Sequence, residues 1–259
     1  MKSGKIELKK IHLLYTHNKI KMTPNVLIVS IEGNIGSGKS TLLDNLKNKS
    51  NNKNIIFLKE PVDEWSKIKD KNGVTILEKF YADQEKYSFP FQMMAYISRL
   101  KLLKDTLNEA IKNTHTLASD DPESKSTIIV ITERSLLTDK MVFAKMLYDS
   151  GKIEHINYQI YLNWFDTFAN EFPVHKVVYV RATPETCYRR VGKRSREGED
   201  KIPLDYLKRC SEYHENMLDK GSDDCVCRDQ LILDGNNDIY ENHSILDEWL
   251  TSIYQFTNM

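Results

Sequence analysis

The sequence has no excess of either charge, few cysteines and no long apolar run. Lysine plus arginine number 37, as do aspartate plus glutamate, so the formal net charge is zero. Without a global positive field, the chain is not expected to bind long nucleic acids. A membrane-spanning helix needs roughly 20 consecutive apolar residues. No run approaches that length, so we expect no membrane partner.

The cysteines lack the spacing of a disulfide framework, so free thiols in a reducing compartment are expected. They are Cys187, Cys210, Cys225 and Cys227. Cys225 and Cys227 form a lone C-x-C pair, whereas a structural zinc ion takes four ligands, so the pair does not favour a metal site. We expect a cytoplasmic location.

Residues 1–24 differ in composition from the rest of the chain, because they are rich in lysine and nearly free of acidic residues. We expect a flexible basic extension, followed by a single domain over residues 25–259. The alternative is a targeting segment that would make the protein mitochondrial, although transit peptides favour arginine and serine.

Short apolar runs rich in β-branched residues alternate with longer stretches of helical periodicity. Strands are predicted at residues 26–31, 55–58, 127–132, 176–180 and 230–233, and helices at 75–87, 89–113, 134–149, 153–171, 204–218 and the C-terminus. Near-continuously apolar strands separated by helices predict an α/β fold with a five-stranded parallel sheet flanked by helices.

A glycine-rich loop joins the first predicted strand to a helix. Its residues fit G-x-x-x-x-G-K-[ST], the P-loop pattern of the P-loop NTPase fold, in the context that the pattern requires. They are Gly33, Asn34, Ile35, Gly36, Ser37, Gly38, Lys39 and Ser40, followed by Thr41. Backbone N–H groups and the helix N-terminus would surround phosphate oxygens. We expect Lys39 at the β- and γ-phosphates and the Ser40 hydroxyl at Mg²⁺. The loop predicts ATP or GTP binding and leaves the acceptor open.

Acidic residues follow two other predicted strands. Because ligands gather at the carboxyl ends of parallel strands, Glu60 is expected near the P-loop, where it can accept the proton of a hydroxyl acceptor. Its alternative role is in an acidic cluster that starts a helix. Glu133 can hold Mg²⁺ and Arg134 can neutralise phosphate charge, with a surface ion pair as the alternative.

An arginine-rich segment, residues 189–200, follows the fourth predicted strand. Arg190, Arg194 and Arg196 can face one way and form a lid over the transferring phosphate. A solvated basic helix end and a nucleic-acid contact are the alternatives.

Several segments, in this order, resemble the deoxyribonucleoside kinase family, which includes deoxycytidine, deoxyguanosine and mitochondrial thymidine kinases. They are residues 31–36 (IEGNIG), 60–62 (EPV), 87–92 (YSFPFQ), 133–135 (ERS), 181–187 (RATPETC) and 202–207 (IPLDYL). The resemblance implies transfer of the ATP γ-phosphate to the 5′-hydroxyl of a deoxynucleoside, with Mg²⁺, in nucleotide salvage. It also implies a homodimer through the helices at residues 89–113 and 153–171.

The resemblance further implies roles for individual residues. Glu60 matches the general base, Arg134 the arginine beside it and Glu133 the acid of the Mg²⁺ site, while Arg190, Arg194 and Arg196 match lid arginines. The residues matched to the nucleoside site are Gln92 for the base, Phe91 and Phe143 around it, Tyr81 and Glu199 for the 3′-hydroxyl, and Trp65 and Leu77 as walls. Asp238 lies in the loop matched to the donor adenine.

The base preference depends on two helix faces. Gln92, Ala95 and Arg99 share one face, and Asp139 and Phe143 share another. An Arg99–Asp139 pair resembles the deoxycytidine and deoxyguanosine kinases, whereas the thymidine-accepting members have smaller or apolar residues there. A buried pair rejects bases that leave it unpaired, so deoxycytidine or a purine deoxynucleoside is predicted over thymidine. The alternative is a pair that only ties two helices together.

Two positions depart from the family pattern. Phe80 stands where members often have methionine, which narrows the pocket. Ile239 follows Asp238 where an aromatic residue is usual, which bears on adenine stacking and ATP preference.

Two other functions compete with this prediction. A nucleoside monophosphate kinase, similar to thymidylate kinase, would need a second phosphate site and an Asp-Arg pair after the third strand. A P-loop binding module would bind nucleotide without turnover, but Glu60, Arg134 and Arg194 together favour catalysis.

Overall fold

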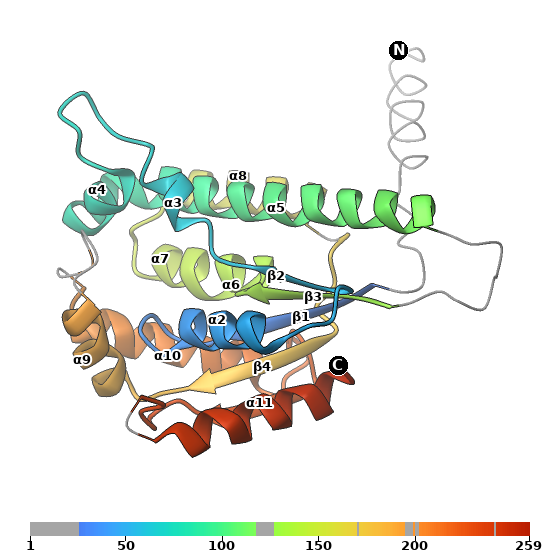
Figure 1. Cartoon of the computed structure of the whole chain (residues 1–259). Helices are drawn as coiled ribbons and strands as arrows, with labels where there is room; N and C mark the ends of the chain where they lie inside the picture. Colours follow the sequence, from blue (N-terminus) through green and yellow to red (C-terminus); the bar gives the residue numbers. More distant parts are fainter. Residues whose placement is uncertain (1–25, 118–126, 170, 195–198, 200–201, 241) are drawn as a thin grey trace, which may run out of the picture.

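The computed structural model describes residues 26–117, 127–169, 171–194, 199, 202–240 and 242–259 (Figure 1). Its five strands are β1 (Val26–Glu32), β2 (Ile55–Leu58), β3 (Ile128–Glu133), β4 (Lys176–Arg181) and β5 (Gln230–Asp234). They form one sheet in the order β2-β3-β1-β4-β5, and every pair is parallel. The predicted α/β P-loop NTPase fold with a five-stranded parallel sheet is confirmed.

The helices flank both faces of this sheet. They are α2 (Lys39–Lys49), α3 (Val62–Trp65), α4 (Ile76–Ala82), α5 (Gln84–Leu117), α6 (Leu136–Thr138), the π-helix η1 (Asp139–Ala144), α7 (Lys145–Asp149), α8 (His155–Phe168), α9 (Pro184–Arg194), α10 (Leu204–Leu218) and α11 (His243–Thr257). In Figure 1, α5 and α8 lie on one side of the sheet and α11 on the other.

Side-chain alternation along the strands separates two apolar cores. Ile28 and Val130 pack in the core that contains the buried side of α5. Their neighbours Val29 and Ile31 face the opposite side, against Leu42 and the other buried leucines of α2 and against α11. Both faces are therefore covered, as the near-continuous apolar strands predict.

Helix boundaries differ from the predicted ones around Pro90. The helix predicted from residue 75 ends at Ala82, and the next begins at Gln84 and continues through Pro90 to Leu117. Thr75 precedes α4 as its N-cap and forms a capping box with Glu78. Pro90 lacks the N–H that would bond the carbonyl four residues earlier, and the helix continues past it. The predicted break at residue 88 is therefore wrong.

The helix predicted at residues 134–149 is three consecutive segments. It begins at Leu136, changes to π-helix over Asp139–Ala144 and ends as α7. The residues predicted as a basic extension, 1–24, lie outside the described residues, so the division into extension and single domain stays a prediction. None of the helices in the described part is both long and apolar enough to span a membrane.

Candidate active site

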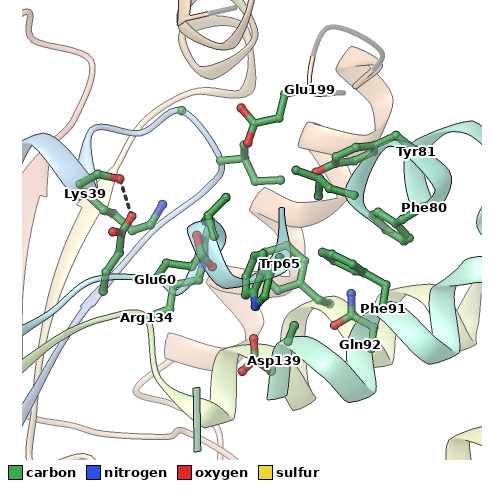
Figure 2. Close-up of a pocket in the computed structure, with 18 of the residues that line it drawn as sticks. Lys39, Glu60, Trp65, Phe80, Tyr81, Phe91, Gln92, Arg134, Asp139 and Glu199 are labelled. Carbon is green, nitrogen blue, oxygen red and sulfur yellow. Dashed lines mark hydrogen bonds and ion pairs between the residues drawn. The ribbon is translucent and has the colours of Figure 1, made fainter. Parts of the chain in front are cut away.

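A pocket opens at the carboxyl ends of the central strands, between the P-loop, α4, α5, η1 and α10 (Figure 2). It brings together most of the site residues predicted from the sequence. Those that line it are Ile35, Gly36, Gly38, Lys39, Ser40, Glu60, Trp65, Leu77, Tyr81, Phe91, Gln92, Glu133, Arg134, Asp139, Phe143, Arg194 and Glu199. Gly33, Asn34, Ser37 and Thr41 belong to the same loop and first helical turn but are not among the lining residues.

The P-loop has the backbone that its glycines allow. Gly33, Gly36 and Gly38 have φ values of 144°, 82° and 107°. A Cβ on Gly36 would lie 2.7 Å from the Cys187 carbonyl oxygen, so α9 packs directly on the loop. Lys39 is buried beneath the loop and donates to the Asn34 carbonyl at 2.7 Å. Burial, together with the positive charge of Arg134, lowers the pKa of Lys39 to about 7.

The bend after β3 is held by a buried carboxylate that the sequence analysis did not single out. Arg134 has φ 63°, in the left-handed region. Glu32, at the end of β1, accepts hydrogen bonds from the Ser135 amide at 3.0 Å and from the Thr138 hydroxyl at 2.6 Å. The Ser30 hydroxyl also donates to Glu32, at 2.5 Å. The signal available in the sequence was an acidic residue between an apolar strand and the P-loop.

The bend places Glu133 against the start of α2. The Ser40 hydroxyl donates to Glu133 Oε1 at 2.5 Å. A hydroxyl and a carboxylate oxygen side by side are ligands that Mg²⁺ takes, usually alongside substrate phosphates and water. The donor set therefore fits the Mg²⁺ that the family implies.

Glu60 lies between two arginines at the centre of the site. Arg134 Nη1 donates to its Oε2, and Arg99 Nη2 donates to its Oε1, both at 2.8 Å. Burial acts to raise the pKa of Glu60, but the charges of Arg134, Arg99 and Lys39 outweigh it and lower the pKa to about 2. The carboxylate is therefore ionised at neutral pH, and both of its oxygens are fixed in position.

Arg99 and Asp139 are in contact, as the sequence predicts, and only Asp139 is among the residues that line the pocket. Arg99 Nε donates to Asp139 Oδ2 at 2.9 Å. Asp139 lines the pocket, whereas Arg99 lies behind it and lines a smaller cavity. Burial raises the pKa of Asp139 more than Arg99 lowers it. The bond from Arg99 to Glu60 was not predicted.

Aromatic side chains form the other half of the pocket. Phe80 stacks on Phe91 with ring centroids 4.5 Å apart, and Trp65 meets Phe91 edge to face at 5.6 Å. Figure 2 shows these rings across the pocket from Lys39 and Glu60. Phe80 lines the pocket, in keeping with the narrowing that the sequence suggests.

Polar groups lie at the edges of this aromatic half. Gln92, from α5, is buried to 2% exposure and lines the pocket. Burial and the nearby Glu199 carboxylate raise the pKa of Tyr81, so its phenol stays protonated and can donate to a sugar hydroxyl. The guanidinium of Arg134 lies 5.2 Å from the centre of the Phe143 ring, which fixes that ring at the pocket wall.

The two predicted lid arginines that the structure describes, Arg190 and Arg194, have different partners. Arg194 lines the pocket and pairs with Glu199. Arg190 points elsewhere, because its guanidinium donates to the carbonyls of Gly235 at 2.6 Å, Asn237 at 2.9 Å and Ser37 at 3.3 Å. Arg196 lies outside the described residues.

The loop after β5, matched to the donor adenine, also stands apart from the pocket. Asp238 accepts from the Tyr240 amide at 2.9 Å and is not a lining residue. Ile239 is buried in the core beside α11. Its side chain therefore does not replace the aromatic residue that is usual in the family.

Replacing Glu32 with glutamine is expected to lower both stability and turnover. The amide keeps one acceptor oxygen but turns an N–H₂ group toward a buried donor, which typically costs about 1–3 kcal/mol. We expect the free energy of unfolding in urea to fall by about that amount and kcat to fall about tenfold. Glu85→Gln, an exposed carboxylate paired with Lys152, is the control. Unchanged urea midpoint and kcat in Glu32→Gln would contradict this role.

Comparisons with known proteins agree with this geometry. The family model for deoxynucleoside kinases matches residues 29–258. A probable deoxycytidine kinase of Fowlpox virus is 30% identical over 257 residues, which cover 98% of this chain and 94% of that protein. Deoxycytidine kinase of Homo sapiens is 32% identical over 206 residues, covering 73% of this chain and 74% of that protein. Mitochondrial thymidine kinase 2 of Homo sapiens is 32% identical over 197 residues, covering 75% of this chain and 65% of that protein. The chain belongs to the deoxynucleoside kinase family, and it is an ATP-dependent deoxynucleoside kinase.

Proposed function

We propose that this kinase phosphorylates deoxycytidine or a purine deoxynucleoside in preference to thymidine, and that it serves nucleotide salvage. The observation that carries the proposal is the buried carboxylate of Asp139 on the pocket wall, in the same lining as Gln92. Relatives named as deoxycytidine kinases support it, and a relative named as a thymidine kinase makes the test necessary.

The chemistry of the bases separates the candidates. A carboxylate is an acceptor only, whereas an amide can both donate and accept. The exocyclic amino groups of cytosine and adenine can donate to Asp139, directly or through water. Guanine has a carbonyl oxygen at the equivalent position and would have to turn its 2-amino group toward Asp139. Thymine carries a carbonyl oxygen and a methyl group where cytosine and adenine carry their amino groups and neighbouring C–H or N7. A carbonyl facing a buried carboxylate leaves both acceptors without a donor, which is strongly unfavourable.

We propose an in-line transfer in which Glu60 accepts the proton of the 5′-hydroxyl. The oxygen–phosphorus bond to the nucleoside forms as the bond between the γ-phosphorus and the departing ADP oxygen breaks. The negative charge that spreads over the phosphate oxygens is neutralised by Lys39, Arg194 and Arg196. Mg²⁺, held by Ser40 and Glu133, would supply further neutralisation of the triphosphate. Fixed between two arginines, Glu60 orients the hydroxyl before it accepts the proton.

A phosphorylation assay with ATP and deoxycytidine, deoxyadenosine, deoxyguanosine and thymidine tests the preference. We expect kcat/KM for deoxycytidine or a purine deoxynucleoside to exceed that for thymidine by roughly 100-fold or more, because an unpaired buried group is costly. Thymidine as the best substrate would leave the kinase assignment in place and remove the Arg99–Asp139 pair as a specificity device. No transfer to any nucleoside, with monophosphates accepted instead, would contradict the proposed acceptor.

Glu60→Gln should remove the base while leaving nucleoside binding largely intact. General-base catalysis contributes roughly 10²–10⁴-fold, and we expect kcat to fall in that range. Nucleoside affinity is followed by intrinsic tryptophan fluorescence, to which Trp65 in the pocket lining contributes. Glu64→Gln is the matched control, because Glu64 lies in the same acidic cluster and is exposed. Turnover at the wild-type rate in Glu60→Gln would refute the assignment.

We also propose a homodimer formed through α5 and α8. On α8, apolar residues recur every fourth position on the outer side, with exposures from 36% to 69%. They are Ile156, Ile160, Trp164 and Phe168, and Ile97 on α5 is 50% exposed. The two helices contact each other, so their exposed apolar residues can form one surface. A contiguous apolar surface of this kind is typical of a protein interface.

Charge reversal of this surface should give monomers. We expect the native protein to have twice the chain mass of 30.2 kDa by light scattering, and the double variant Ile160→Glu/Trp164→Glu to have the single-chain mass. Ile232→Glu, at 53% exposure on β5, is the control and should stay dimeric. A monomeric native protein, or a dimer that survives the double variant, would contradict the proposal.

The proposed location is the cytoplasm, where the four free cysteines would remain reduced. A targeting role for residues 1–24 would instead place the protein in the mitochondrion, and a fusion of those residues to a fluorescent reporter would distinguish the two.

A further inference from the structure

Arg99 is buried in the middle of α5 and touches both functional halves of the pocket without lining it. Its side chain is 7% exposed. It donates to Asp139 on the nucleoside side and to Glu60 on the phosphate side. Its third contact is the backbone carbonyl of Glu133, at 2.7 Å. One guanidinium therefore connects η1, the segment that follows β2 and the end of β3.

Two arginines from different elements bind the two oxygens of the Glu60 carboxylate. Arg99 belongs to α5, and Arg134 follows β3. Arg99 takes Oε1 and Arg134 takes Oε2, at equal distances of 2.8 Å. A carboxylate held by one arginine can still rotate about its last torsion. When each oxygen is bonded from a different direction, the carboxylate cannot rotate. The direction in which Glu60 faces an acceptor hydroxyl is therefore fixed.

The nearby charged groups do not supply a substitute for Arg99. Lys39 is close enough to lower the pKa of Glu60, but its hydrogen bond goes to the Asn34 carbonyl and not to Glu60. Asp139 is negative when ionised and cannot donate to Glu60. Without Arg99, the Oε1 side of Glu60 would lose a charge-assisted hydrogen bond of the stronger class.

We propose that Arg99 is a positioning residue for the catalytic carboxylate, fixing the orientation of Glu60 through its Oε1 atom. The inference rests on the proposed role of Glu60. It goes beyond base selection, because Arg99 bonds both Asp139 on the nucleoside side and Glu60, the proposed proton acceptor. Loss of Arg99 should slow phosphate transfer with every deoxynucleoside, including those whose bases make no use of Asp139.

A double-mutant cycle tests whether Arg99 acts through Glu60. The four proteins are the wild type, Arg99→Met, Glu60→Gln and the double variant. Transfer is measured in single turnovers with saturating deoxynucleoside and enzyme in excess over labelled ATP, so that slow variants give a rate. In the wild-type background, Arg99→Met should slow transfer roughly tenfold to 100-fold, the range for a hydrogen bond to a charged group. In the background of the Glu60→Gln variant, the same substitution should change the rate less than about twofold.

Controls separate this effect from loss of folding and from base reading. Lys101→Met removes an exposed cation from the same helix and should leave the rate unchanged. Thermal unfolding and the change in tryptophan fluorescence on nucleoside binding report whether each variant is folded. Arg99→Gln repeats the cycle should Arg99→Met unfold. An equal slowing in both backgrounds, or a slowing that appears with some deoxynucleosides and not with others, would overturn the inference. A wild type without transfer to any deoxynucleoside would instead overturn the proposed function itself.

Discussion

The left-handed bend at Arg134 is the constraint on which the active site depends. An L-residue in this conformation costs roughly 1–2 kcal/mol, so its surroundings must hold it. Glu32 supplies that hold from the neighbouring strand, by accepting hydrogen bonds from the Ser135 amide and the Thr138 hydroxyl. The bend sends two successive side chains in different directions, Glu133 to the P-loop serine and Arg134 to Glu60. The P-loop serine and the proposed proton acceptor are thereby connected through a single turn of backbone.

The second constraint on the site is the burial of its charged side chains. Glu60, Arg99, Arg134 and Asp139 lie within one connected set of ion pairs, each with little exposure to solvent. Desolvation of each ion carries a penalty of several kcal/mol, which close pairing offsets only when the geometry is good. Such a cluster is weak evidence for stability. Its value lies in defining one arrangement of the pocket, since removing any member takes an ion-pair partner from at least one buried neighbour.

Much of the fold and site could be predicted, and the failures have identifiable physical causes. Apolar strands separated by helices predict the parallel sheet, and the rule that ligands meet at strand ends brings Glu60 to the P-loop. Helical periodicity predicts the face of α5 on which Arg99 lies. It does not predict which acceptors Arg99 bonds, because its long side chain has several torsions and several acceptors are nearby. Arg190 shows the same limit, because its acceptors are backbone carbonyls that no residue pattern reveals. The π-helix at Asp139–Ala144 was also missed, since an i to i+5 hydrogen-bond pattern has no sequence signature of its own.

The attachment of Arg190 has a mechanical consequence for the segment that follows it. Its guanidinium ties α9 to the loop after β5 and to the Ser37 carbonyl of the P-loop. The first turns of α9 are therefore attached to the phosphate-binding loop through this side chain. Any swing that carries Arg194 toward a bound triphosphate must pivot beyond Arg190. Gly192 is suited to that pivot, because it has no Cβ and no neighbouring atom would obstruct one within 4 Å. Such a swing would involve only a short arm, whose base is held to the P-loop by Arg190.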